Sequence, residues 1–110
     1  MTANASVMLQ VLAEPTRRAI MERLADQPSA VTDLARDLPV TRSAVSQHLR
    51  VLKDARLVTD RAVGRRRIYM VDPDALAILH AYFESFWTRS LATFREVAES
   101  SPEEQVKDHG

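Results

Sequence analysis

Five polar side chains between residues 41 and 55 have a spacing that places them on one face of a helix, namely Arg42, Ser43, Ser46, Gln47 and Arg50. Side chains three and four positions apart in a helix lie on the same face. Ser, Gln and Arg form hydrogen bonds with base edges and phosphate oxygens. A solvated surface helix would instead favour Glu and Lys, and such a face remains the alternative. The pattern favours contact with duplex DNA.

A second basic group follows within a predicted β-hairpin. Alternating residues predict strands at 57–62 and 66–71, joined by a turn at Val63-Gly64-Arg65 in which Gly64 permits a positive φ. The hairpin carries four arginines, Arg61, Arg65, Arg66 and Arg67. Alternation puts Arg65 and Arg67 on one face and Arg66 on the other. We expect this hairpin to contact the phosphate backbone or the minor groove; a hairpin that only adds solubility is the alternative.

Charge is unevenly distributed along the chain. The net charge of the 110 residues is zero, but residues 36–67 contain nine Arg or Lys and three acidic residues, for a net charge of +6. Residues 68–110 have a net charge of −5, and residues 1–35 have a net charge of −1. The local electrostatic field, and not the charge of the whole chain, decides where a polyanion binds. The basic middle segment therefore agrees with a nucleic-acid partner.

The apolar periodicity predicts a mostly α protein with one small β-hairpin, in the α+β class. The predicted helices cover residues 8–13, 15–27, 31–38, 41–55 and 74–98. Pro15 and Pro73 suit first-turn positions, and Thr32, Thr41 and Asp72 are candidate N-caps. The tight connection at Pro39-Val40 makes the third and fourth helices a helix-turn-helix, with the hairpin as its wing. We expect residues 1–100 to form one domain for DNA binding and dimerisation, and residues 101–110 to be a flexible tail.

Three segments resemble the ArsR/SmtB family of bacterial repressors: LAEPTRR at residues 12–18, TRSAVSQHLRVL at 41–52 and GRRRIY at 64–69. The resemblance spans roughly residues 8–98. It implies a winged-helix fold, dimerisation through the first and last helices, and repression by binding palindromic operators. Members of this family commonly release DNA when a metal or another effector binds. For this chain no effector is evident, and autoregulation is one possible role.

One position departs from the family pattern. The family usually reads Ala-Gly-Leu-Val after the recognition helix, where this chain reads Ala55-Arg56-Leu57-Val58. Glycine suits a left-handed helix cap. If the same geometry persists here, Arg56 bears a strain of about 1 kcal/mol. The same side chain would then be available for an added phosphate contact.

The last predicted helix carries more apolar side chains than packing on one small domain needs. We therefore predict a homodimer interface formed by this helix and the first one. Its candidate residues are Met8, Leu9, Leu12, Leu79, Phe83, Phe86, Trp87, Leu91 and Phe94. Phe83 and Trp87 are the candidate anchors. The alternatives are a single wide core face, or an apolar small-ligand pocket at these two aromatic residues.

The histidines allow more than one reading. His48 is grouped with Thr41 among the candidate DNA-binding residues, although it could equally support local structure. His80 and Glu84 stand four positions apart and favour a surface ion pair. The resemblance implies metal ligands on this helix and cysteines on the third helix, a pattern that this chain does not match. We therefore predict no metal and no cofactor.

Several protein classes are excluded by what the chain lacks. It has no cysteine and no apolar run of the ~20 residues that span a bilayer. It has no glycine-rich phosphate loop and no nucleophile elbow, so we do not expect an enzyme. A cytoplasmic, DNA-binding transcriptional repressor is the prediction. The alternatives are a metal- or ligand-responsive sensor and a winged-helix module that binds proteins.

Overall fold

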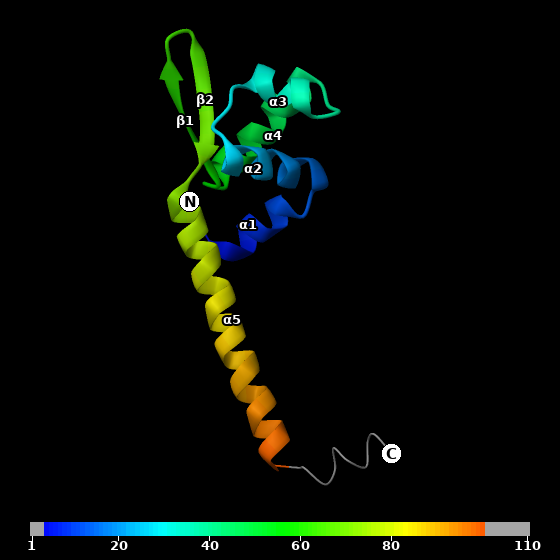
Figure 1. Cartoon of the computed structure of the whole chain (residues 1–110), viewed down its shortest axis with the longest axis vertical. Coiled ribbons are helices and arrows are strands. Elements are labelled where there is room, and N and C mark those ends of the chain that lie inside the picture. Colours follow the sequence, from blue (N-terminus) through cyan, green and yellow to red (C-terminus); the bar gives the residue numbers. More distant parts are fainter. Residues whose placement is uncertain (1–3, 101–110) are drawn as a thin grey trace. The chain divides into compact units, whose positions relative to one another are not determined.

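A computed structural model describes residues 4–100 as five helices and a two-stranded antiparallel hairpin. In order these are α1 (Ala5–Leu12), α2 (Pro15–Asp26), α3 (Val31–Asp37), α4 (Arg42–Asp54), β1 (Val58–Val63), β2 (Arg66–Val71) and α5 (Pro73–Ser100), labelled in Figure 1. The predicted fold class is confirmed. The predicted tail at 101–110 lies outside the described residues. The chain divides into two compact units, one up to Leu79 and one from His80, and α5 begins in the first and continues into the second.

The helix starts follow from capping groups, and the start of α1 and the N-cap residue of α3 differ from the prediction. Thr41 Oγ1 accepts a hydrogen bond from the Ala44 N–H at 3.1 Å, as expected for the N-cap of α4. The first helix begins three residues earlier than predicted because Asn4 Oδ1 accepts from the Val7 N–H at 2.9 Å. Thr32 is not a cap, which corrects the prediction.

The N-cap residue of α3 is Ala30, and Asp33 in the first turn of the helix accepts a hydrogen bond from it. The Ala30 N–H donates to Asp33 Oδ2 at 3.3 Å, so a side chain inside the helix satisfies the backbone group before it. At the start of α5, Asp72 Oδ1 accepts from the Asp74 N–H at 2.9 Å, and Pro73 occupies the first turn. The predicted Asp72 cap is therefore confirmed.

The core of the first unit is apolar and draws on every helix and strand, including the start of α5 at Ala75. Its fully buried large side chains are Met8, Ile20, Leu34, Val45, Leu49, Leu52 and Leu57. Measured over whole residues, no polar or charged residue of the described chain is buried. Met8 was predicted to lie at a dimer interface, and its exposure of 0% corrects that prediction. The helical periodicity that places an apolar side chain inward does not distinguish a core from an interface.

The end of α4 confirms the geometry that was expected from the departure at Arg56. Arg56 has φ +63° and is the one non-glycine residue with a positive φ in the described chain. Its N–H donates to the Lys53 carbonyl at 2.9 Å, and the Leu57 N–H donates to the Leu52 carbonyl at 2.9 Å. These two bonds define a Schellman motif, in which the left-handed position usually belongs to glycine. The second bond also explains why β1 begins at Val58 and not at residue 57.

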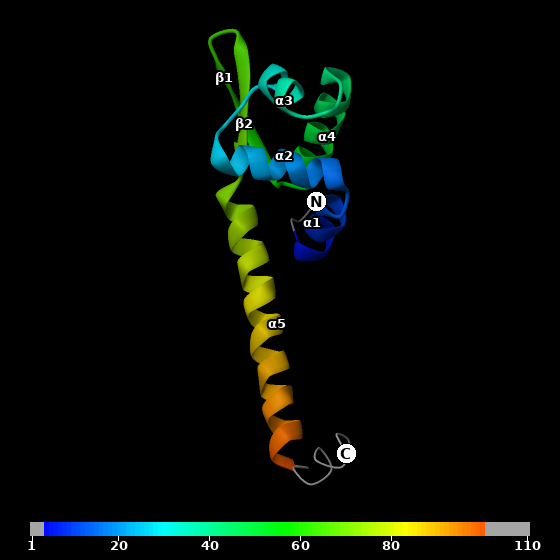
Figure 2. The ribbon, with the colours of Figure 1, turned by 45° about the vertical axis from the view of Figure 1, so that its right-hand side comes forward.

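The hairpin pairs in register from Val58 with Val71 to Val63 with Arg66. Gly64 has φ +61° at the first turn position, where a type II′ turn requires glycine. The chain before α3 extends the pairing, because Ser29 and Tyr69 exchange two backbone hydrogen bonds of 3.0 and 2.9 Å. Figure 2 shows the connection from α2 to α3 passing beside β2. The base of the hairpin is therefore tied to the helical part of the unit.

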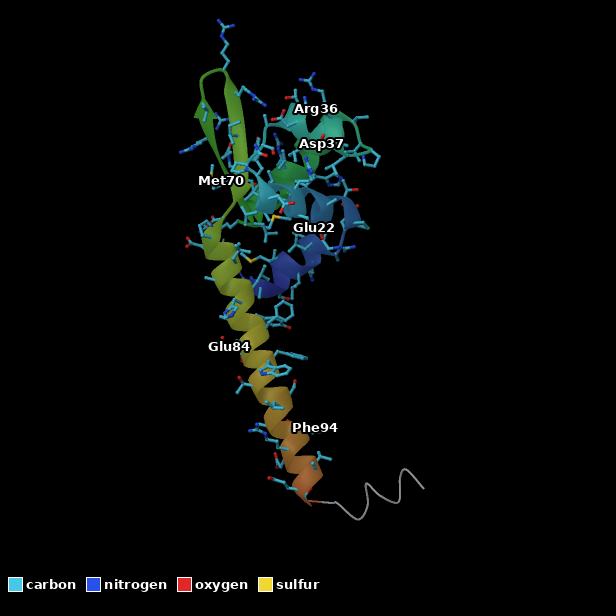
Figure 3. All side chains as sticks on the ribbon, in the orientation of Figure 1. Glu22, Arg36, Asp37, Met70, Glu84 and Phe94 are labelled. Atoms are coloured by element: carbon cyan, nitrogen blue, oxygen red, sulfur yellow. The ribbon has the colours of Figure 1, made fainter. Side chains whose placement is uncertain are left out.

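The second unit contains one helical segment of the described chain, the part of α5 from His80. Its aromatic side chains are exposed: Phe83 by 54%, Phe86 by 53%, Trp87 by 67% and Phe94 by 70%. Figure 3 shows the side chain of Phe94 extending away from the helix axis. No helix in residues 4–100 has both the length and the hydropathy that crossing a bilayer requires.

Candidate DNA interface

The fourth helix has one buried face and one exposed face. Val45, Leu49 and Leu52 have exposures of 0, 1 and 0%. The exposed face carries the five residues that the sequence singles out, Arg42, Ser43, Ser46, Gln47 and Arg50. Within residues 4–100 none of these five side chains forms a hydrogen bond or ion pair. Their donors and acceptors are therefore available to an external partner.

The helix-turn-helix forms as predicted. Pro39 follows Leu38, which has an extended backbone (φ −119°, ψ 149°) and ends α3. The Val40 N–H then donates to the Leu38 carbonyl at 2.8 Å, which makes the turn tight. Figure 2 shows α3 and α4 as neighbours joined by this short connection. Thr41 Oγ1 accepts the capping hydrogen bond of α4, which leaves its O–H proton without a partner in residues 4–100.

Two of the hairpin arginines are held by carboxylates of the same chain. Arg66 Nη2 donates to Asp33 Oδ2 of α3, and Arg67 Nη1 donates to Asp60 Oδ2 of β1 at 3.0 Å. Arg65 stands in the turn, and Arg61 lies in β1. Both are exposed and have no ion-pair partner in the described chain. The four basic side chains therefore divide into two that are paired and two that are free to meet a phosphate.

Asp60 joins the hairpin to α4. Its Oδ1 lies 2.8 Å from Lys53 Nζ, so the two carboxylate oxygens contact cations from two different elements. Its side chain is 6% exposed. The hydrogen bond from Lys53 lowers the pKa of Asp60 below its ordinary value, partial burial opposes this, and Arg67 lowers the pKa further. The carboxylate is therefore ionised at neutral pH.

A polar cleft of about 540 Å³ opens between α4 and the hairpin. The lining residues from α4 include Ser46, Arg50, Lys53 and Asp54, and those from the hairpin are Asp60, Arg67 and Tyr69. The cleft thus combines two residues of the exposed helix face with the ion-paired group of Asp60.

His48 faces α2 and not the exposed side of α4. Its Nδ1 lies 3.8 Å from Glu14 Oε2 and 3.4 Å from Arg17 Nη1, and its side chain is 24% exposed. Arg17 Nε also donates to the Val11 carbonyl at 2.7 Å, at the end of α1. These contacts favour the structural reading of His48 over a phosphate contact.

Comparison with known proteins agrees with this geometry. Residues 14–60 match the family described as "Bacterial regulatory protein, arsR family". The chain is 58% identical over 91 residues to the HTH-type transcriptional regulator Rv2034 of Mycobacterium tuberculosis, covering 83% of this chain and 85% of that protein. The chain belongs to the arsR family of bacterial regulatory proteins.

Other members of the arsR family extend the likeness to solved structures. A crystal structure of a possible transcriptional regulator for arsenical resistance has 49% identity and a TM-score of 0.66, covering 84% of this chain and 95% of its own. An ArsR-like transcriptional regulator from Rhodococcus sp. RHA1 has 31% identity and a TM-score of 0.72, covering 86% of this chain and 92% of its own. A transcriptional repressor SmtB homolog from Synechocystis is 48% identical over 58 residues, covering 53% of this chain and 44% of that protein.

The prediction of a DNA-binding transcriptional repressor of this family is confirmed. The arsR family consists of DNA-binding regulators and not of enzymes. The individual contact residues, the pseudo-palindromic operator and the homodimer stay predictions.

The predicted pairing of His80 with Glu84 is present as a contact, with 3.6 Å between His80 Nδ1 and Glu84 Oε2. Both side chains are largely exposed. Residues 4–100 contain no group of three or more His, Asp or Glu that could hold a metal ion.

Sequence reasoning missed two residues of this interface, Asp33 and Asp60. Asp33 interacts with Arg66 and Arg36, and Asp60 interacts with Lys53 and Arg67. One signal for Asp60 was present, because it stands two positions after the buried Val58 and so on the inward face of a basic hairpin. An acidic residue at such a position indicates a cationic partner. An apolar pocket of about 460 Å³ was also missed, and Met21, Leu24, Met70 and Leu76 are among its lining residues.

Proposed function

We propose that this regulator is a homodimer that represses transcription by binding a pseudo-palindromic operator, with α4 of each protomer in a major groove. The main support for this proposal is the outer face of α4. Its polar side chains are exposed and have no partners in residues 4–100, while the opposite face of the helix is buried. The major groove, ~12 Å wide, accepts one helix. The packing of the buried face fixes the orientation of the helix. The exposed side chains are therefore held in fixed positions from which they can contact bases.

Individual roles on α4 follow from side-chain chemistry. Gln47 is suited to bidentate pairing with adenine, and Arg42 or Arg50 to bidentate pairing with guanine. Ser43 and Ser46 can bond phosphate or base. The N-terminus of α4 adds free N–H groups and a partial positive charge that favour a phosphate.

The wing is proposed to contact the DNA backbone mainly through its two unpaired arginines. Arg65 stands in the turn and Arg61 in β1, both exposed. Arg66 and Arg67 are already engaged with carboxylates. We therefore assign them a smaller share of the phosphate contacts than the sequence alone would give them.

The dimer is proposed to form through α5 and α1. Phe83, Phe86, Trp87, Leu91 and Phe94 follow helical spacing on one side of α5. Exposed aromatic side chains in such a stripe are typical anchors of a partner interface. Leu9 and Leu12 of α1 are half-buried and Leu79 packs beside the core of the first unit, so these three would lie at the margin.

On this proposal residues 1–100 serve both DNA binding and dimerisation, and the protein works in the cytoplasm at its operator. Twofold symmetry predicts two half-sites about one or two helical turns apart. Repression then follows from occupation of the promoter, and the promoter of its own gene is one candidate target.

The test begins with genomic fragments selected by the purified full-length protein. Fluorescence anisotropy on the selected fragment should give a log K that falls linearly with log[salt], with a slope of about −0.9 per contacted phosphate. A flat salt response contradicts the electrostatic part of the proposal. Failure to enrich any sequence contradicts specific recognition.

The dimer is tested by sedimentation equilibrium. Trp87→Glu should dissociate the dimer and weaken operator binding, because it places a charge in the apolar stripe. Ser85→Glu is the matched control, since residue 85 lies on the opposite side of the same helix. A monomeric wild-type protein, or equal dissociation by both variants, contradicts the proposed interface.

A further inference from the structure

The cleft between α4 and the hairpin contains a carboxylate that opposes the function of the surface around it. DNA phosphates are anions, yet Asp60 is ionised and lies beside Ser46 and Arg50 in the same cleft. A negative charge at a phosphate-binding surface lowers affinity unless it has another task. The contacts of Asp60 indicate what that task is.

Asp60 uses its two oxygens separately. Oδ1 lies 2.8 Å from Lys53 Nζ on α4, and Oδ2 lies 3.0 Å from Arg67 Nη1 on β2. Because the carboxylate is 6% exposed while both cations are more than half exposed, the cations reach inward to a fixed anion. The carboxylate therefore links the hairpin to the recognition helix and occupies two positive side chains that remain more than half exposed.

We propose that Asp60 is a specificity-determining positioning residue, which withholds Lys53 and Arg67 from DNA phosphates and so limits binding to sequences other than the operator. The inference rests on the proposed function of α4 and the hairpin. Phosphate contacts carry no sequence information and supply most of the affinity for random DNA. Keeping two cations occupied lowers random binding and leaves base contacts by α4 unaffected.

Asp54 offers a matched control within the same cleft. It also lines the cleft and also carries one negative charge, but it forms no ion pair among residues 4–100. Asp60→Asn and Asp54→Asn therefore change the net charge equally. Only Asp60→Asn also breaks ion pairs, and so only this variant releases Lys53 and Arg67.

The experiment measures anisotropy of the full-length variants on the selected operator and on a scrambled duplex, across a salt series. Asp60→Asn should make the slope of log K against log[salt] more negative by about 1 to 2, since each added phosphate contact contributes about 0.9. Affinity for scrambled DNA should rise on the order of 10-fold, with a smaller rise for the operator, so the specificity ratio falls. Asp54→Asn should raise both affinities slightly and equally, with an unchanged ratio.

Two results overturn the inference. Equal effects of Asp60→Asn and Asp54→Asn would mean that only net charge matters. Weaker binding to both duplexes with an unchanged slope would mean that Asp60 serves only the fold. A wild-type protein without salt-dependent binding would instead contradict the proposed function itself, so the two failures are distinguishable.

A conservative variant, Asp60→Glu, keeps the test valid if Asp60→Asn is poorly folded, and a double-mutant cycle extends the test where Asp60→Asn folds. Asp60→Glu retains the charge and should keep the wild-type specificity ratio. Arg67→Gln should weaken scrambled-DNA binding less in the wild-type background than in the Asp60→Asn background, because only the second background has a released Arg67. Equal effects of Arg67→Gln in both backgrounds, or an Asp60→Glu protein with the lowered ratio of Asp60→Asn, contradict the inference.

Discussion

The outer face of α4 and the hairpin beside it are both basic, but their positions are maintained in different ways. The helix is held by apolar packing of its inner face, and its outer polar side chains have no partners in the described chain. The hairpin has few buried side chains, and ion pairs from Arg66 to α3 and from Asp60 to α4 hold its two faces.

This difference assigns the two regions different tasks. A surface that reads bases needs a fixed backbone and free donors, which packing from behind provides. A surface that follows the phosphate backbone can be held in place by ion pairs. The same charged side chains then also determine how strongly that surface binds phosphates. Packing is insensitive to salt, whereas exposed ion pairs are screened by it. The helix should therefore keep its position under conditions that loosen the hairpin.

The largest expected effect is on the packing that holds α4. Leu49→Ala removes a side chain that is 1% exposed and should lower the free energy of unfolding by about 2–5 kcal/mol, from lost burial and a residual cavity. Val51→Ala is the control on the same helix, because Val51 is 38% exposed. Urea unfolding of both variants measures the difference. Similar losses from both would contradict the role of the inner face.

Gln47→Ala should remove base reading without loosening the helix. We expect discrimination between the operator and a scrambled duplex to fall by about 1–3 kcal/mol, the range for one bidentate base contact. Binding to the scrambled duplex should stay the same, because no phosphate contact is lost. Gln27→Ala removes the same side chain at the end of α2 and should change neither affinity. An unaltered preference in Gln47→Ala would show that another residue reads the base.

The sequence predicts the helix, the hairpin and the exposed polar face because each depends on local spacing and capping. Thr41, Pro15 and Gly64 are local signals of this kind, and the left-handed geometry at Arg56 followed from one departure in a motif. The ion pairs are different. Asp33 and Arg66 are 33 positions apart, and only the fold, which pairs Ser29 before α3 with Tyr69 of β2, brings them together.

One wrong prediction and one that was left open show the limit of local patterns. Met8 fits the apolar side of α1, but spacing alone does not tell whether that side meets the core or a second chain. His48 was left between two roles because the side chains that face it, Glu14 at the N-cap of α2 and Arg17 within α2, come from a distant part of the chain.

The hairpin arginines should differ among themselves if ion pairing matters. Arg65→Gln should make the salt slope less negative by about 0.9, the contribution of one phosphate. Arg66→Gln should change the slope less, because Asp33 already holds Arg66, and should speed amide exchange in β2 by releasing the strand from α3. Anisotropy and hydrogen exchange measure the two effects. Equal slope changes would mean that Asp33 does not withhold Arg66.

The junction between helix and hairpin should be improved by one substitution. Arg56→Gly should raise the free energy of unfolding by about 1 kcal/mol, because glycine adopts the positive φ of this position without strain. Arg56→Ala loses the same charge but keeps a Cβ, so it separates the backbone effect from electrostatics. Any loss of DNA affinity shared by both variants measures a phosphate contact of Arg56. Equal stability of the two variants would contradict backbone strain at this junction.

The smallest expected effect is the response of the hairpin to acid. The pKa of Asp60 is lowered in the folded protein, chiefly by Lys53, from an unfolded value of about 3.9. The stability from this carboxylate is therefore fully present above that unfolded value and is lost as the pH falls through the lower folded pKa. The stability difference between wild type and Asp60→Asn should shrink in that window, while the difference between wild type and Leu49→Ala should stay nearly constant. Parallel pH profiles for the two variants would mean that packing, and not charge, holds the hairpin as it holds the helix.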